Sequence, residues 1–66
     1  MPQNDYGVYQ ETEPTLWVKE TIPSLILSSA DQAKTWSEVE AMTVATYLSQ
    51  GGTEFKVGRP NDRVPH

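Results

Sequence analysis

The segment from Ser37 to Val57 constrains the fold of this chain most, because it predicts a helix, a stop signal and a strand in succession. Ser37 and Glu40 have the spacing of a capping box, which opens a helix. Four apolar residues then recur at i, i+3, i+4 and i+7 and form one stripe: Ala41, Val44, Ala45 and Leu48. Gly51 and Gly52 supply a left-handed residue that ends the helix. The segment therefore predicts a helix with one buried face.

The strand after this helix is predicted over residues 53–57. Its alternation places Phe55 and Val57 toward the helix and the residues between them toward solvent. Met42 and Tyr47 flank the apolar stripe of the helix. The side opposite the stripe carries polar residues: Thr43, Thr46 and Gln50. Because the stripe contains two alanines, we expect the helix to approach a sheet closely.

The first half of the chain predicts a β-hairpin. Residues 15–20 alternate, with Leu16 and Val18 on one side and Trp17 on the other. A turn follows over residues 21–24, and residues 25–27 form a short apolar run typical of a buried strand. If Leu16 and Val18 face the helix, Trp17 lies on the open side of the sheet.

Two other segments leave alternatives. Residues 6–10 predict a short edge strand that Gly7 weakens, and Pro14 is expected to end regular structure after it. Residues 28–36 fit a helix, because Ser29 begins a second capping box, or a turn and a short strand leading to the helix. We favour the turn and strand, because the capping box at Ser37 precedes a cleaner apolar pattern.

The order strand, strand, helix, strand predicts an α+β fold. We expect a three- or four-stranded, largely antiparallel sheet with one helix packed on one face. A chain of 66 residues forms one domain, and a domain of this size buries only about 60% of its unfolded surface. Residues 1–5 are expected to be loose, and residues 58–66 to form an extended tail.

The composition excludes several classes of protein. The chain contains no cysteine, which excludes disulfides and thiolate metal sites and favours an intracellular setting. It contains no apolar run of even ten residues, so we expect no signal peptide or membrane span and a cytoplasmic location. The formal net charge of −4 argues against direct binding to nucleic acid or anionic membranes.

The residues needed for catalysis are not present in a usable arrangement. The only histidine, His66, is the last residue, so no serine has a base to activate it. Gly51 and Gly52 follow a helix, whereas a phosphate-binding loop precedes one. Glu11 and Glu13 lie in a linker-like acidic segment. We therefore predict no enzymatic activity, no catalytic residue, no cofactor and no metal site.

Four residues are predicted to bind a partner: Trp17, Lys56, Arg59 and Arg63. Tryptophan and arginine are the residue types most often found as interface hot spots. The three bases form the only basic cluster and leave the last strand together. Two alternatives stay open. The N-terminal segment or Trp36 could cover Trp17, and the basic cluster could be an ordinary polar terminus.

Three stretches resemble small host-takeover proteins encoded by phages, nearest the inhibitor of host RNA polymerase from T7-like phages. These are Leu16-Trp17-Val18 at the start of a strand, the Glu- and Ala-rich helix from Ser37 to Leu48, and Val57-Gly58-Arg59-Pro60 after the last strand. In that family, arginines on the last strand contact the polymerase. The resemblance implies this role for Arg59, while Lys56 is the nearest base to the position of a second family arginine.

We therefore expect a non-enzymatic binding protein, a phage or prophage accessory protein in the cytoplasm of an infected or lysogenic bacterium. It would inhibit a larger host protein by occluding its surface, and host RNA polymerase is one candidate target. A small monomer can present the roughly 800 Å² that a standard interface needs. The alternatives are a homo-oligomeric structural or assembly component and an acidic DNA-mimic inhibitor.

Overall fold

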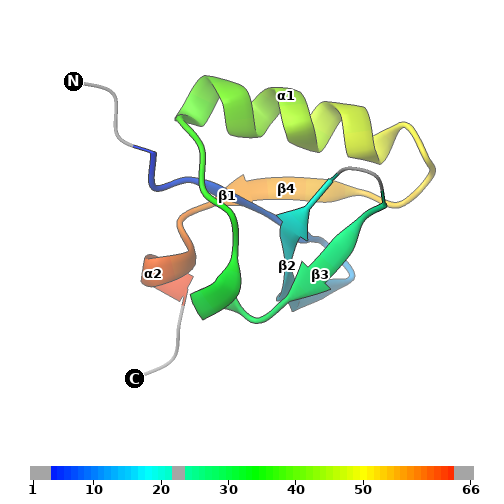
Figure 1. Cartoon of the computed structure of the whole chain (residues 1–66). Helices are drawn as coiled ribbons and strands as arrows, with labels where there is room; N and C mark the ends of the chain where they lie inside the picture. The colour runs from blue at the N-terminus through cyan, green and yellow to red at the C-terminus, as the bar shows by residue number, and fades with distance from the viewer. Residues whose placement is uncertain (1–3, 22–23, 64–66) are drawn as a thin grey trace.

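A computed structural model describes residues 4–21 and 24–63, the last two by their backbone alone. The elements are four strands, one long helix and two short helical turns: β1 (Gly7–Gln10), β2 (Glu13–Glu20), β3 (Ile26–Ser28), η1 (Ala30–Gln32), α1 (Glu38–Ser49), β4 (Phe55–Gly58) and α2 (Pro60–Arg63). The strands form one antiparallel sheet in the order β3-β2-β1-β4. Helix α1 crosses one side of the sheet and α2 lies on the other (Figure 1). The predicted α+β fold is confirmed.

Strand β1 is in the middle of the sheet, so the expectation of an edge strand was wrong. It pairs with β2 on one side and with β4 on the other, where Val8 lies opposite Val57. A Cβ on Gly7 would lie 2.9 Å from Cγ of Pro60 and 3.0 Å from Cε3 of Trp17. The glycine therefore permits close packing at the centre of the fold instead of weakening a strand.

Strand β2 begins before Pro14, which corrects the expectation that this proline ends regular structure. The pairing of β1 with β2 shifts register between Tyr9, which is opposite Trp17, and Gln10, which is opposite Glu13. Pro14 lies inside this irregular stretch and is exposed. A proline without an N–H is tolerated there because the hydrogen-bond ladder is already interrupted.

The core lies between α1 and the sheet, as the apolar patterns predict. Its buried members come from four elements: Val8, Val18, Ala41, Ala45 and Phe55. Partly buried side chains complete it: Tyr6, Leu27, Trp36, Val44, Leu48 and Val57. The predictions that the apolar stripe of the helix faces the sheet and that Phe55 and Val57 point inward are therefore confirmed.

Both ends of α1 are where their capping residues predict. The Ser37 hydroxyl accepts a hydrogen bond from the backbone N–H of Glu40 at 3.3 Å and donates one to its carboxylate at 3.1 Å. The helix ends at Ser49, and Gly52 has a φ of 105°, which favours glycine. The capping signals were therefore sufficient to define this helix.

Residues 28–36 form a turn and a single β-bridge, as favoured from the sequence. The turn is η1, and Trp36 pairs with Tyr6 through backbone hydrogen bonds of 3.0 and 2.7 Å. Ser29 precedes η1, but its hydroxyl donates to Asp31 and does not cap the backbone. A continuous helix through this segment is excluded by the bridge.

The described part of the C-terminal tail, residues 58–63, ends in a helical turn and is not extended, which corrects that expectation; residues 64–66 lie outside the described residues. Pro60 begins the helical turn α2 and is buried. Proline suits the first position of a helix because its missing N–H would have no partner there. Its ring packs at Gly7 and holds the turn against the sheet. Of the residues expected to be loose, 1–3 lie outside the described residues, as do residues 22 and 23 of the predicted turn.

Candidate functional site

Trp17 is buried, which decides between the alternatives left open by the sequence: the side chain is covered. Its side chain is 1% exposed, and it lies on the sheet face opposite α1. The Tyr9 ring is 5.0 Å away, centroid to centroid, at a tilted angle of 53°. Pro60 lies over the same place. A partner could reach Trp17 only after the tail moved.

Arg59 connects the tail to the start of the chain. Its Nε lies 3.6 Å from Oδ2 of Asp5, and its Nη2 donates a 3.0 Å hydrogen bond to the Tyr6 hydroxyl. The guanidinium also lies 5.0 Å from the centre of the Tyr6 ring, within the range of a cation–π interaction. Half of this side chain is exposed, but its charge already has partners within the chain.

Lys56 is likewise paired. Its Nζ lies 3.2 Å from Oε2 of Glu54 and 3.6 Å from Oε1 of Glu11. A hydrogen bond with Glu54, followed by the negative charges of Glu54 and Glu11, raises the pKa of Lys56 above its ordinary value of 10.5. The fourth predicted residue, Arg63, belongs to α2, and its side chain lies outside the described part. The structure therefore does not assemble these residues into a surface of unpaired bases.

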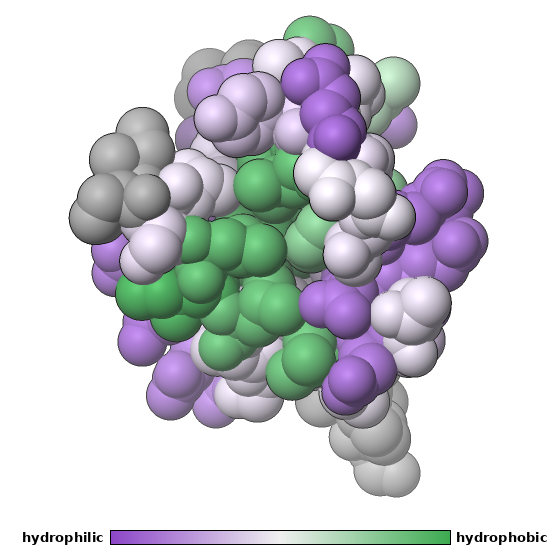
Figure 2. Space-filling model, turned by 90° about the vertical axis from the view of Figure 1, so that its right-hand side faces the viewer, coloured by the Kyte–Doolittle hydropathy of each residue, from purple (hydrophilic) through white to green (hydrophobic). Residues whose placement is uncertain are grey.

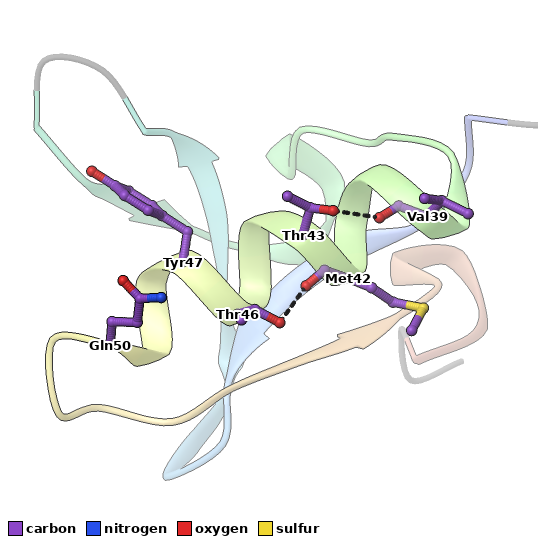
Figure 3. Close-up of a pocket in the computed structure, with 6 residues that line it drawn as sticks. All are labelled: Val39, Met42, Thr43, Thr46, Tyr47 and Gln50. Carbon is purple, nitrogen blue, oxygen red and sulfur yellow. Dashed lines mark hydrogen bonds between the residues drawn. The ribbon is translucent and has the colours of Figure 1, made fainter.

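The outer face of α1 exposes large apolar side chains to solvent. Six residues line a shallow depression there: Val39, Met42, Thr43, Thr46, Tyr47 and Gln50. Val39, Met42 and Tyr47 are 74, 55 and 68% exposed. In Figure 3 these side chains point away from the sheet, with Val39 and Met42 toward one end of the helix and Tyr47 and Gln50 toward the other. Among the described residues, nothing covers the apolar side chains of Val39, Met42 and Tyr47.

The two threonines make this face less polar than their residue type suggests. Thr43 Oγ1 donates to the carbonyl of Val39 at 3.1 Å, and Thr46 Oγ1 donates to that of Met42 at 2.9 Å (Figure 3). A hydroxyl that is bonded to its own helix needs no further donor or acceptor. The threonine methyl groups therefore remain for contact with an apolar partner.

The sequence contained a signal for this face that we did not use. The six lining residues have the spacing i, i+3, i+4, i+7, i+8 and i+11. That is a second complete helical stripe beside the buried one. By residue type alone, Thr43, Thr46 and Gln50 count as polar, and Met42 and Tyr47 flank the buried stripe.

A second group of exposed apolar residues lies at the sheet edge. Leu25 and Ile26, at the start of β3, are both exposed. Figure 2, which views the molecule from the right-hand side of Figure 1, shows apolar surface gathered in one patch with polar residues around it. This edge strand is only three residues long, and short edge strands limit unwanted pairing.

The described residues contain no group of three or more acidic or histidine side chains placed to hold a metal ion. Among them there is also no helix with the length and apolar character needed to cross a membrane. No family model, curated protein or solved structure matches the chain. The candidate site therefore rests on the geometry of α1 alone.

Proposed function

We propose that this chain is a non-enzymatic binding protein that covers part of the surface of a larger protein, with the outer face of α1 at the centre of the contact. One observation carries this proposal: three large apolar side chains of α1, Val39, Met42 and Tyr47, point outward and are more than half exposed. Burial of such a side chain contributes about 1.5–3 kcal/mol. A partner that covers the face gains this free energy.

The shape of the face favours a macromolecule over a small ligand. Five of the six lining residues belong to α1 and the sixth, Gln50, is its C-cap residue, so the depression has a floor but no opposing wall. Small-molecule sites are concave and typically bury about 70–90% of their ligand. A helix that lies in a groove of another protein is buried from both sides by the partner, and residues at helical spacing supply the anchors.

The resemblance to phage host-takeover proteins supports a narrower form of the proposal. In this form the chain is a phage or prophage protein that inhibits a bacterial protein in the cytoplasm, with host RNA polymerase as one candidate target. Arg59 would then contact the partner, and it would first have to leave Asp5 and Tyr6. This target stays a prediction, as do the roles of Lys56 and Arg63.

The second candidate is a homo-oligomeric structural or assembly component. It is favoured by the near-symmetry of the outer face about its centre, between Thr43 and Thr46. In an antiparallel pair of helices, Met42 of one copy would meet Tyr47 of the other, and a methionine–aromatic contact is favourable. The two candidates predict different masses in solution, which light scattering on the pure protein distinguishes.

The experiment is affinity capture from a bacterial lysate, followed by mass spectrometry, with three immobilised proteins. Thr46→Asp places a charge in the outer face, and Thr15→Asp places the same charge on an exposed position of β2. We expect a protein that the parent and Thr15→Asp retain and that Thr46→Asp loses, because disruption of a hot-spot region costs ~2 kcal/mol or more.

Calorimetry with the retained protein should then show roughly thirtyfold weaker binding by Thr46→Asp, the equivalent of about 2 kcal/mol. Identical capture by all three proteins would mean that α1 is not the contact surface. A stable oligomer of the parent that Thr46→Asp dissociates would replace the proposal with the homo-oligomeric candidate.

A further inference from the structure

Resting on the proposed function, we infer that the partner of α1 presents an apolar surface bordered by lysine or arginine side chains. The reason is a separation of charge within this chain. Residues 35–55, which include all of α1, contain Glu38, Glu40 and Glu54 and no base. The bases with described side chains come from other segments: Lys19, Lys34, Lys56 and Arg59. The charged residues of the helix are therefore all acidic.

The acidic groups of α1 also differ from the other charges in their pairing. The ion pairs found among the described residues all involve Lys56 or Arg59. Within this part of the chain, neither Glu38 nor Glu40 has a cationic partner, although Glu40 accepts a hydrogen bond from the uncharged Ser37 hydroxyl. Both residues are exposed. Their negative charges are therefore available to a partner.

Helix stability explains only part of this charge distribution. Acidic residues in the first turn interact favourably with the helix dipole, so Glu38 and Glu40 also stabilise α1. The same dipole favours bases in the last turn, and α1 has none there. A base at that end would stabilise the helix but would repel a basic partner. Its absence is expected if the whole outer face docks on a basic surface.

Two other possible partners of the outer face, a second copy of this chain and a membrane surface, fit this charge pattern less well. A second copy would bring its own Glu38 and Glu40 to an interface that has no base. A helix of 12 residues is about 18 Å long, and helix-to-helix contact alone falls short of the roughly 800 Å² per partner of a standard interface. Membrane-surface helices place lysine and arginine beside their apolar face, whereas α1 places glutamate there.

Two synthetic peptides test the inference. One is an amphipathic helix with a leucine stripe flanked by lysines, and the other has glutamate in place of every lysine. Each is titrated into the isotope-labelled full chain, and amide chemical shifts are followed by NMR. We expect the lysine peptide to shift the amides of residues 38–50 and to bind more weakly as salt is raised, because salt screens exposed charges. The glutamate peptide should leave these amides unchanged.

Matched variants separate the local effect from net charge. Glu38→Gln with Glu40→Gln removes two charges beside the outer face, and Glu13→Gln with Glu20→Gln removes two from exposed positions of β2. We expect the first pair to weaken binding of the lysine peptide by about twofold to thirtyfold, the range for loss of two exposed ion pairs. The second pair should change it by less than about twofold.

Three results would overturn the inference. They are equal binding of the two peptides at residues 38–50, equal losses from the two variant pairs, or no shift at these residues with either peptide. Equal binding of the two peptides would leave the proposed function standing, because α1 would still be an apolar contact surface without a preference for charge. The proposed function itself is tested separately, by whether Thr46→Asp loses the protein that the parent and Thr15→Asp capture.

Discussion

On its inner face helix α1 carries alanine at the points of closest contact, and on its outer face it carries valine, methionine and tyrosine. Ala41 and Ala45 are 0 and 6% exposed, whereas Val39 and Tyr47 are 74 and 68% exposed. The inner face thus allows the helix backbone to approach the sheet, and the outer face leaves large apolar groups in solvent. Stability of the isolated domain accounts for the first face but not for the second.

The largest expected effect compares adjacent residues on the two faces. Ala45→Asp should cost several kcal/mol, on the order of the whole stability of so small a domain, because it buries an unpaired charge. Thr46→Asp should change stability by no more than about 0.5 kcal/mol, because position 46 is exposed. Thermal melts followed by circular dichroism measure both. Equal midpoints would show that the two faces are not distinguished by burial.

A smaller effect is expected from Ser37, the residue that caps the start of α1 and so supports both of its faces. Ser37→Ala should lower the free energy of unfolding by roughly 1 kcal/mol, because the N–H of Glu40 loses its acceptor. Ser24→Ala, at an exposed position outside the strands and helices, serves as the control. Urea denaturation compares the two. A loss as large in Ser24→Ala would indicate that the cap contributes nothing specific.

The smallest effect concerns the exposed surface around Lys56, where charges are paired within the chain. The pKa of Lys56 is raised, chiefly by its hydrogen bond with Glu54, so Glu54→Gln should lower it more than Glu11→Gln. A raised pKa stabilises the fold below the pKa of the unfolded chain, and this contribution disappears as the pH rises through the folded pKa. It is therefore constant near neutral pH. NMR titration of the Lys56 side chain in each variant measures how far its pKa falls. A larger fall in Glu11→Gln than in Glu54→Gln would contradict the prediction.

Features set by neighbouring residues were predictable from the sequence. Ser37, Glu40 and the glycine pair determine where α1 begins and ends, and alternation places Phe55 and Val57 inward. These signals act over a few residues and need no knowledge of the tertiary fold. The buried face of the helix and the inward side of the last strand follow from them, whereas the central place of β1 does not.

Contacts between distant parts of the chain were not predictable in the same way. Trp17 is covered by Pro60, and Arg59 is paired with Asp5, so burial and pairing depend on where the tail packs. The outer face was missed for a different reason. A threonine counts as polar in any sequence pattern, but Thr43 and Thr46 donate their hydroxyl hydrogens to carbonyls of the same helix.

The pairing of β1 with β4 also has a consequence for synthesis on the ribosome. Val8 emerges early, but its neighbour Val57 is made near the end of the described sequence. Until then the nascent chain can form α1 and the antiparallel strands β1, β2 and β3, which are local in sequence, but β1 lacks its other neighbour, β4. Non-local pairing of this kind slows folding. During that interval the core lacks Phe55, so apolar surface on the inner side of α1 is left for a chaperone to bind.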